Sequence, residues 1–272
     1  MDSNDAAHGS NAADPNVSDQ NAGSGAQHSL STLVDSARKT SLDREPTKLI
    51  PWAYDILGDR LMMSTAFGKS GMCLVHMIKT LNLSIPIYFV DTGFHFPETL
   101  KFVDTLRETW GVNLLLQRPR VYGVEFVKKF GKEGEKLYET DPDLCCQKNK
   151  VEPFAELLET HGGWITGVRR DQSSTRATAE PIEVLEGGKL KLQPLAYWTR
   201  DDVEAYIKRH KIELHPLFSQ GYTSIGCAPC TRQNNDASNE RAGRWAGKAK
   251  TECGLHTYWK QKGKASGAAA SG

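Results

Sequence analysis

The sequence predicts an α/β protein built on a mainly parallel, twisted sheet that is flanked by helices on both faces. Short apolar runs at 61–63, 85–90, 114–116 and 164–167 have the length and composition of buried strands. Helical patterns lie between them, and strands that alternate with helices form parallel sheets covered on both sides. Ligands bind such sheets beyond the carboxyl ends of the strands. The residues that follow each predicted strand are therefore the first candidates for a site.

The first predicted strand, 61–63, leads into a loop of small polar residues at 64–71, and a helix follows the loop. The apolar residues of this helix fall on one face, at Leu74, Val75, Ile78 and Leu81. The second predicted strand, 85–90, is stopped by the turn-forming residues Asp91, Thr92 and Gly93.

Two more helices are marked at their starts. Pro97 suits the first position of a helix, because its ring fixes φ and no backbone N–H is needed there. The apolar residues of that helix are Leu100, Val103, Leu106 and Trp110. Thr199 precedes another helix, since Thr-Arg-Asp-Asp resembles a capping box with Asp202 in the acidic position.

The composition limits the class of protein. The chain has 272 residues, of which 39% are hydrophobic and 25% charged, as in soluble globular proteins. A formal net charge of +1 gives no global field to attract nucleic acid or a membrane. No apolar run is long enough to cross a bilayer, and the polar, acidic first residues lack the pattern of a signal peptide. We therefore expect a cytoplasmic protein, in which six cysteines indicate metal binding or catalysis rather than disulfides.

The ends of the chain differ in composition from the middle. Residues 1–42 are rich in Ser, Asn, Asp, Gly and Ala and carry few large apolar side chains. Such a segment cannot bury enough surface to offset its ordering entropy, so we expect a disordered N-terminal tail. We expect a folded domain over 43–245 and a mobile C-terminal segment over 246–272.

The loop at 64–71 has the features of an anion site. Ser64, Gly68 and Ser70 lie between a strand and a helix, where backbone N–H groups and the helix N-terminus can hold an anion. The end of the loop resembles a Walker A motif, but Met63 stands where the motif has its first glycine. An ordinary strand-to-helix turn is an equal alternative. Asp91, after the next strand, can meet a ribose or a metal, or can cap its own turn.

Four cysteines form two pairs that can supply soft metal ligands. Cys145 and Cys146 are adjacent, and Cys227 and Cys230 form a CxxC motif. Adjacent residues reach two vertices of a zinc tetrahedron awkwardly, whereas a cubane cluster spreads its attachment points over four irons, which favours a cluster. A redox dithiol at Cys227 and Cys230, and plain burial of the other pair, are the alternatives. Cys73 lies in a helical pattern and is expected in the core.

Cys253 is set apart from the other cysteines by its surroundings. Lys248 and Lys250 precede it in a polar segment, and cations lower the pKa of a thiol and hold anionic substrates. His256 follows three residues later and can assist. We therefore expect a reactive thiol, with an incidental exposed cysteine as the alternative.

Three arginines follow the fourth predicted strand. Arg169, Arg170 and Arg176 lie where guanidinium groups can clamp phosphate or sulfate through charge-assisted hydrogen bonds. A solvated basic loop is an equal alternative.

Together these motifs resemble the assimilatory adenylyl-sulfate (APS) reductases, relatives of the PAPS reductases with the ATP-pyrophosphatase, or adenine nucleotide alpha hydrolase-like, fold. The resemblance covers 49–256 and rests on the two cysteine pairs, the segments 164–177 and 241–245, and Glu-Cys-Gly-Leu-His at 252–256. It implies a 4Fe–4S cluster on Cys145, Cys146, Cys227 and Cys230 that supports the substrate site electrostatically. It implies substrate contacts at Ser64, Phe67, Gly68, Ser70, Asp91, Lys150, Arg169, Arg170, Arg176, Arg241, Arg244 and His256.

The resemblance also implies an activity in assimilatory sulfate reduction and cysteine biosynthesis. The Cys253 thiolate attacks the sulfur of APS, AMP leaves, and thioredoxin or a similar dithiol releases sulfite from the S-sulfonated cysteine. The cluster cysteines accompany a preference for APS over PAPS in this family. Residues 43–245 then form the nucleotide- and cluster-binding domain, as a monomer or a homo-oligomer, and 246–272 carry the catalytic cysteine.

Two departures from the family pattern stand out. Many relatives carry Glu-Asp after the Phe-Gly of the loop, where this chain has Lys69, Ser70 and Gly71. The chain also lacks a thioredoxin-like domain after His256, so we expect a separate protein as reductant. A PAPS reductase, a tRNA sulfur-transfer enzyme and a non-enzymatic iron–sulfur or zinc sensor are the alternatives. The tRNA enzymes commonly use an SGGxDS loop, which 64–71 does not match.

Overall fold

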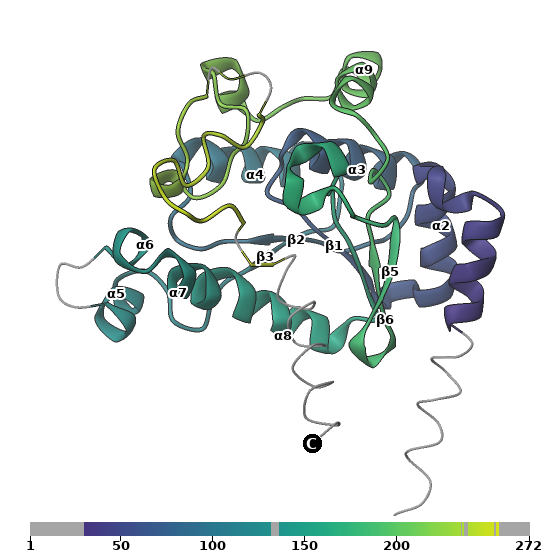
Figure 1. The fold of residues 1–272 in the computed structure, drawn as a ribbon, viewed down its shortest axis with the longest axis horizontal. Coiled ribbons are helices and arrows are strands. Elements are labelled where there is room, and N and C mark those ends of the chain that lie inside the picture. Colours follow the sequence, from purple (N-terminus) through teal and green to yellow (C-terminus); the bar gives the residue numbers. More distant parts are fainter. Residues whose placement is uncertain (1–29, 132–135, 235, 237–238, 253, 256–272) are drawn as a thin grey trace, which may run out of the picture.

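The predicted fold class is confirmed by a computed structural model, which describes residues 30–131, 136–234, 236, 239–252 and 254–255. Six strands form one sheet in the order β3-β2-β1-β4-β6-β5 (Figure 1). Their bounds are β1 Leu61–Ser64, β2 Ile87–Val90, β3 Leu114–Gln117, β4 Gly163–Ile165, β5 Ile182–Leu185 and β6 Lys189–Leu192. Neighbouring strands run parallel, except that β5 pairs antiparallel with β6 at one edge.

Helices cover both faces of the sheet. They are α2 Pro46–Leu57, α3 Lys69–Thr80, α4 Pro97–Thr109, α5 Val124–Phe130, α6 Leu137–Thr140, α7 Pro142–Cys146, α8 Glu152–Thr160 and α9 Arg200–His210. Figure 1 shows α3 and α4 on one face and α8 on the other. The predicted helix starts at Pro97 and after Thr199 are confirmed, and Thr199 and Asp202 form the reciprocal capping box.

The alternation of side chains along β1 divides the core into two layers. Leu61 and Met63 belong to the larger apolar cluster, which includes residues of α2, α3 and α4. Met62 points to the other side, where it packs with Trp164 of β4 and with Phe154 of α8. Strands β1 and β4, in the middle of the sheet, are buried on both faces and therefore carry apolar residues at successive positions.

The order of the strands places a crevice between β1 and β4. The chain proceeds from β1 to β2 and β3 on one side and reaches β4, β6 and β5 on the other. The connections therefore leave β1 and β4 in opposite directions, and in parallel sheets such a switch point forms the ligand crevice at the carboxyl ends. The register Met63↔Ile165 brings the loops that follow these two strands together.

The N-terminal segment differs from the expectation over residues 30–42. Residues 30–39 form a helix, and its Val34 and Ala37 are buried against the main core. Arg38 also donates to the Ile182 carbonyl at 2.9 Å. The prediction of disorder for 1–42 rested on the average composition of that segment, which does not reveal a short amphipathic helix at 30–39. The predicted disorder therefore extended too far along the chain. Residues 1–29 lie outside the described residues.

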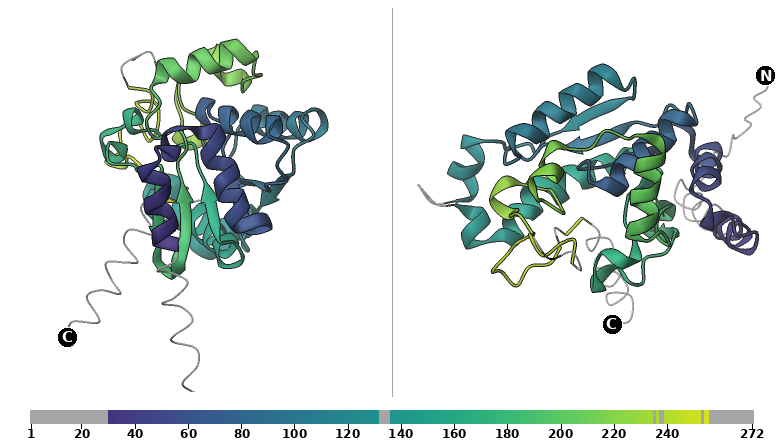
Figure 2. Two further views of the ribbon diagram at one scale, coloured as in Figure 1. Left: turned by 90° about the vertical axis from the view of Figure 1, so that its right-hand side faces the viewer. Right: turned by 90° about the horizontal axis from the view of Figure 1, so that it is seen from above.

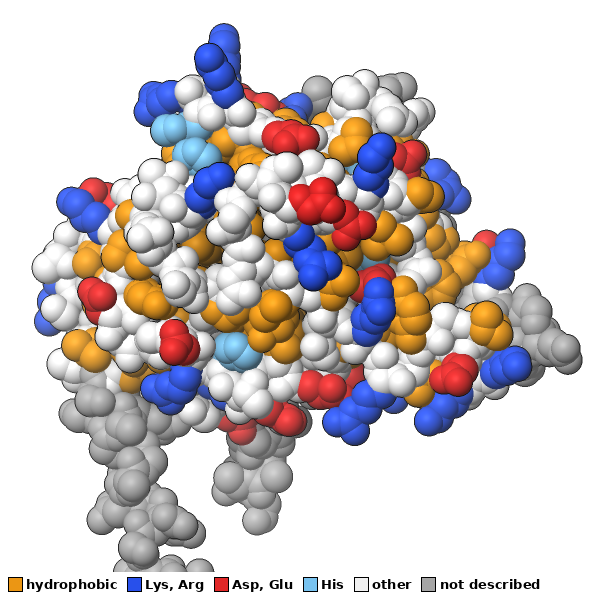
Figure 3. All heavy atoms as spheres, turned by 180° about the vertical axis from the view of Figure 1, so that it is seen from behind, with side chains coloured by type: hydrophobic (Ala, Val, Ile, Leu, Met, Phe, Trp, Pro, Cys, Tyr) orange, Lys and Arg blue, Asp and Glu red, His pale blue; other side chains and the backbone are white. Residues whose placement is uncertain are grey.

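The surface carries charges of both signs. Figure 3 shows basic and acidic side chains interspersed over the face opposite to that of Figure 1. This distribution agrees with the net charge of +1. In the part of the chain that the structure describes, no helix combines the length and the apolar character needed to span a membrane.

Candidate active site

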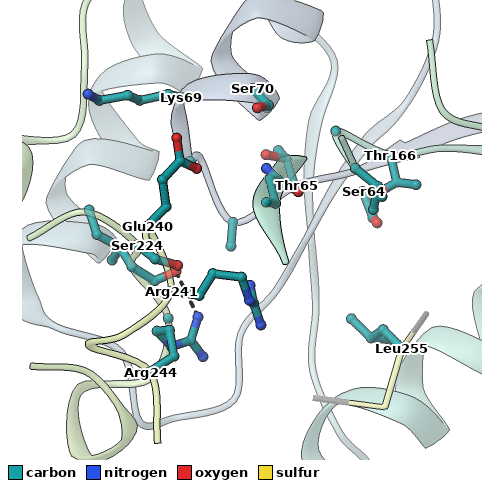
Figure 4. A pocket seen from close by; sticks show the side chains of 18 of the residues that line it. Ser64, Thr65, Lys69, Ser70, Thr166, Ser224, Glu240, Arg241, Arg244 and Leu255 are labelled. Atoms are coloured by element: carbon teal, nitrogen blue, oxygen red, sulfur yellow. Dashed lines mark hydrogen bonds between the residues drawn. The ribbon is translucent and has the colours of Figure 1, made fainter. Parts of the chain in front are cut away.

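A cavity of about 220 Å³ opens at the carboxyl ends of β1 and β4. Its walls come from the loop after β1 and the start of α3, from 166–169 after β4, and from segments near the C-terminus. Figure 4 shows Lys69 and Ser70 on one side of the cavity and Arg241 and Arg244 on another, with Leu255 apart from both. Segments distant in the sequence therefore meet around one space.

The loop after β1 exposes backbone rather than large side chains to the cavity. Phe67 adopts a positive φ of 56°, and its side chain is buried against Phe89 and Phe102. The Thr65 hydroxyl accepts a hydrogen bond from the Phe67 N–H at 2.9 Å and closes the turn. No described side chain caps the start of α3, so the N–H groups of its first turn are available to an anion in the cavity.

The loop after β4 approaches the start of α3 closely. A Cβ on Gly167 would lie 3.1 Å from the Gly71 nitrogen and 3.2 Å from Ser70, so a glycine keeps the two loops in contact. Arg169 then donates to the Ser70 hydroxyl at 2.6 Å. This arrangement joins the two loops on either side of the switch point.

Arg169 is buried in the wall of the cavity, where it connects several segments of the chain through hydrogen bonds. Its side chain is 2% exposed, and it also donates to Asp171 at 2.9 Å and to Glu240 at 3.0 Å. These protein groups accept hydrogen bonds from the guanidinium N–H groups of Arg169, and a buried guanidinium needs such partners. Arg169 therefore holds the loops and the segment around Glu240 together.

Two further arginines of the cavity bind a carboxylate of the chain itself. Arg176 donates to both oxygens of Glu252, at 2.8 and 3.0 Å, and Arg241 donates to the same carboxylate at 3.0 Å. Burial alone raises the pKa of Glu252, but the hydrogen bond and charge of Arg176, together with Arg241, hold it below its usual value. The carboxylate is thus ionised and bound between two cations.

Arg244 lines this cavity, and its neighbour Trp245 lines both this cavity and a second one. Its guanidinium lies over the Trp245 ring at 4.4 Å and donates to the Ile225 carbonyl at 3.3 Å. A Cβ on Gly226 would come within 2.3 Å of the Arg244 Nη2, so only glycine leaves room for this position. Lys150, on the π-helical turn Gln147–Val151, lines the same cavity.

The second cavity is narrow and collects the four paired cysteines. Cys145 and Cys146, at the end of α7, face Cys227 and Cys230 across it. Among the described residues, no three His, Cys, Asp or Glu side chains converge closely enough to hold a single metal ion. Lys150 and Trp245 line both cavities and form the wall between them.

The pKa values of these thiols reflect their proximity. Burial raises the pKa of Cys145 to about 12, and the three other cysteines add to the effect. Burial also opposes ionisation of Cys227, but Lys150, a hydrogen bond with Thr92 and Arg244 lower its pKa overall. One thiol of the set is therefore prepared for ionisation by cations that also line the larger cavity.

The structure brings together most, but not all, of the residues proposed from the sequence as substrate contacts. Those that line the larger cavity are Ser64, Gly68, Ser70, Lys150, Arg169, Arg176, Arg241 and Arg244. Phe67 lies in the core instead. Cys253 and His256 lie outside the described residues.

Asp91 and Arg170 do not line the cavity. Asp91 accepts from the Gly93 N–H at 3.1 Å, from Arg118 at 3.0 Å and from Tyr122, so it holds the turn after β2. Arg170 donates to Glu180 at 2.8 Å and lies 4.4 Å from the centre of the Tyr197 ring. In the structure both side chains serve contacts within the protein.

Three residues of the site were not predicted from the sequence. Glu240 pairs with Arg169, Glu252 pairs with Arg176 and Arg241, and Trp245 separates the two cavities. An acidic residue directly before a predicted nucleophile, in an otherwise basic segment, was the available signal for Glu252. The partners of Glu240 are set by long-range folding and have no local signal.

Comparisons with known proteins identify relatives over most of the chain. Residues 60–233 match the family model described as phosphoadenosine phosphosulfate reductase domain. The adenosine 5'-phosphosulfate reductase of Streptomyces coelicolor is 38% identical over 228 residues, which cover 84% of this chain and 94% of that protein. Adenosine 5'-phosphosulfate reductase 2 of Bacillus subtilis is 40% identical over 210 residues, 76% of this chain and 88% of that protein.

Solved structures agree with the sequence matches. The phosphoadenylyl-sulfate (PAPS) reductase of Candida auris, in a phosphate complex, has a TM-score of 0.62 and 30% identity, covering 73% of this chain and 96% of that one. The FMN adenylyltransferase of Candida glabrata, with FAD and pyrophosphate, has a TM-score of 0.51 at 14% identity and covers 85% of each chain. The latter likeness extends to the fold alone.

Proposed function

The chain belongs to the phosphoadenosine phosphosulfate reductase family, and from this premise we propose that it is an oxidoreductase that reduces adenylyl sulfate (APS) to sulfite and AMP. One observation carries the proposal for this chain's own residues. The cavity at the switch point has the open N–H groups of α3 on one side and cationic side chains on the other. A nucleotide that ends in a sulfate needs both kinds of group.

Two residues close to the proposed nucleophile in the sequence line the cavity. Glu252 and Leu255, on either side of Cys253, both line the cavity. This supports Cys253 as the residue that reacts with the sulfate group.

The proposed chemistry has two stages. The Cys253 thiolate attacks the sulfate sulfur, an S–S bond forms, the S–O bond to the phosphate breaks, and AMP leaves with that electron pair. A dithiol such as thioredoxin then attacks the cysteine sulfur, sulfite leaves with the electron pair of the S–S bond, and the second thiol resolves the mixed disulfide. The dithiol is oxidised by two electrons and the sulfur is reduced by two.

The cations have distinct parts in this scheme. Arg244 and Lys150 both line the larger cavity, where they can neutralise sulfate and phosphate oxygens as AMP leaves. Arg169 holds the walls in position and has its donors on protein groups. His256, three residues after Cys253 in the sequence, is proposed to assist its reaction.

The second cavity supports a proposed 4Fe–4S cluster on Cys145, Cys146, Cys227 and Cys230. All four side chains line one narrow space, and a cluster binds each cysteine to a different iron, so the thiols need not converge on one point. Lys150 and Thr92 beside Cys227 supply donors to a thiolate there. When bound, the cluster contributes charge next to the wall that carries Lys150 and Trp245.

Mass spectrometry of the anaerobic protein after APS is added without reductant tests the activity. We expect one sulfonate adduct, on Cys253, and its release as sulfite when thioredoxin is added. Parallel turnover with PAPS tests the substrate, and a clear preference for PAPS contradicts the choice of APS. Cleavage of ATP that depends on tRNA, without sulfite, contradicts the proposed chemistry as a whole.

A further inference from the structure

We infer that Glu252 is a positioning residue, whose carboxylate, clamped between Arg176 and Arg241, fixes the next residue, Cys253, for attack on the sulfate group. This inference rests on the proposed function and adds to it a part for an acidic group. An acid in a cavity for an anionic substrate is otherwise unexpected, because it repels the substrate and opposes ionisation of a neighbouring thiol.

The contacts of Glu252 are those of a built site. Its side chain is 9% exposed, and those of Arg176 and Arg241 are 11% and 14% exposed. Arg176 binds both carboxylate oxygens through Nε and Nη2, which fixes the plane of the carboxylate as well as its position. Arg241 adds a bond to the carboxylate and another to the Thr251 carbonyl at 3.0 Å, so the backbone before Glu252 is held too.

The chain is anchored again just beyond Cys253. Leu255 packs on the apolar cluster of Met62, Phe154 and Trp164, on the face of the sheet that α8 covers. Gly254 has a φ of 88°, and a Cβ there would lie 3.3 Å from Val151. The described residues near position 253 are thus held by a charged contact at Glu252 and by an apolar contact at Leu255.

The segment before Glu252 is bound to α6 and to α7, the helix that carries Cys145 and Cys146. Lys248 donates to the Tyr138 carbonyl of α6 at 2.5 Å, and Lys250 pairs with Asp143 of α7. Figure 1 shows the last described residues, in yellow, running past α6 and α7. The contacts of Lys248 and Lys250 hold this segment beside the cavity, and the two arginines that bind Glu252 fix the position of its side chain there.

Electrostatics and positioning predict opposite effects when Glu252 becomes Gln. Glu252→Gln removes a negative charge from the cavity, so charge alone makes the thiol more acidic, the anion bind more tightly and the attack faster. If the clamp positions the thiol, the same change slows the attack, because a misplacement of about 1 Å costs on the order of 100-fold in rate. The sign of the change in rate therefore decides between the two.

The experiment follows S-sulfonation of Cys253 in the anaerobic, full-length, iron-loaded protein during a single turnover without reductant. We expect Glu252→Gln to form the adduct about 100-fold more slowly. Its affinity for AMP should stay equal or increase, and its iron content should not change. Glu252→Asp, which restores the charge at a shorter reach, should recover part of the rate. Glu156→Gln, at a carboxylate that pairs with Arg120 outside the cavity, is the matched control and should behave as the wild type.

A second measurement follows the clamp without any reaction. Trypsin cleavage after Lys250 should be faster in Glu252→Gln than in the control, because the segment is less firmly held. An adduct rate equal to or above that of the wild type overturns the inference, as does a loss of AMP affinity as large as the loss of rate. If the wild type itself forms no adduct on Cys253, the proposed function fails and the inference falls with it.

Discussion

Replacing Gly226 by Ala tests the placement of Arg244 without removing its charge. The new Cβ would lie 2.3 Å from the Arg244 Nη2 and 2.5 Å from its Cζ, whereas ordinary van der Waals contact begins at 3.4 Å. The guanidinium must therefore move by about 1 Å to restore a normal separation. It is the far end of a flexible side chain, so the fold can absorb the shift.

The expected cost is mainly functional. Displacing a charge-stabilising group by about 1 Å should lower kcat/KM roughly 100-fold, or by about 2.7 kcal/mol of transition-state stabilisation. The move weakens the 3.3 Å bond to the Ile225 carbonyl and the contact with Trp245, which together are worth about 1–2 kcal/mol of folding stability.

The assay is sulfite release from APS with excess reductant, with urea unfolding and iron content measured on the same samples. The decisive comparison is a double-mutant cycle with Arg244→Ala. If Gly226→Ala acts through the guanidinium, it should cost less than threefold once Arg244 is gone. A full 100-fold loss in that background, or wild-type activity of Gly226→Ala alone, would falsify the reasoning.

Further predictions concern the cysteines, the core and pH. Cys227→Ser should abolish the bound iron and the visible absorbance of the cluster, whereas Cys73→Ser should keep both; retained iron in the first variant contradicts the ligand assignment. Burial raises the pKa of Cys73 to about 12, so in the native protein this thiol should resist iodoacetamide at about pH 8 and react only after unfolding. Ile165→Ala, in the buried strand β4, should lower the free energy of unfolding in urea by about 2–5 kcal/mol, and a loss below 1 kcal/mol contradicts the packing described. The pKa of Glu252 is below its ordinary 4.5, so its contribution to stability is complete above that pH and is lost as the pH falls through the lower folded value. The difference in unfolding free energy between wild type and Glu252→Gln should thus be constant from about pH 8 to pH 5 and shrink below it, and a difference that grows on acidification contradicts the clamp.

The fold could be predicted from the sequence wherever the local residues themselves indicate a strand or the start of a helix. The strands β1 and β4 are apolar runs because successive residues in them are buried, and Thr199 and Pro97 mark helix starts through local chemistry. The apolar run of β3 also predicted a strand, although Leu115 and Leu116 are exposed at the edge of the sheet. The strands β5 and β6 were missed: each has only four residues, and charged residues interrupt both. Lys191 is 4% exposed and is made compatible with the sheet by Glu183 of β5, a partner that no local pattern reveals.

In the candidate site, too, some residues could be predicted from local sequence and others could not. The residue types and spacing of the cysteine pairs suggested that they share one location, and the structure places all four at one cavity. The roles of the charged residues depended on distant partners. Asp91 pairs with Arg118, and Arg169, although it lines the cavity, donates to Ser70 and Glu240, so both side chains make contacts within the protein.

The connection between the two cysteine pairs has a consequence for the order of folding. Residues 147–226 separate the pairs, and this stretch contains α8, β4, β5, β6 and α9. Closing so long a loop is entropically unfavourable until contacts within it form, so Cys146 and Cys227 meet only when half of the sheet is in place. A nascent or partly folded chain therefore presents two separate dithiols rather than one four-thiol site. On the proposed assignment of a 4Fe–4S cluster to these four cysteines, loading of the cluster is a late event in biogenesis, and a chain that carries it has already completed β4, β5 and β6.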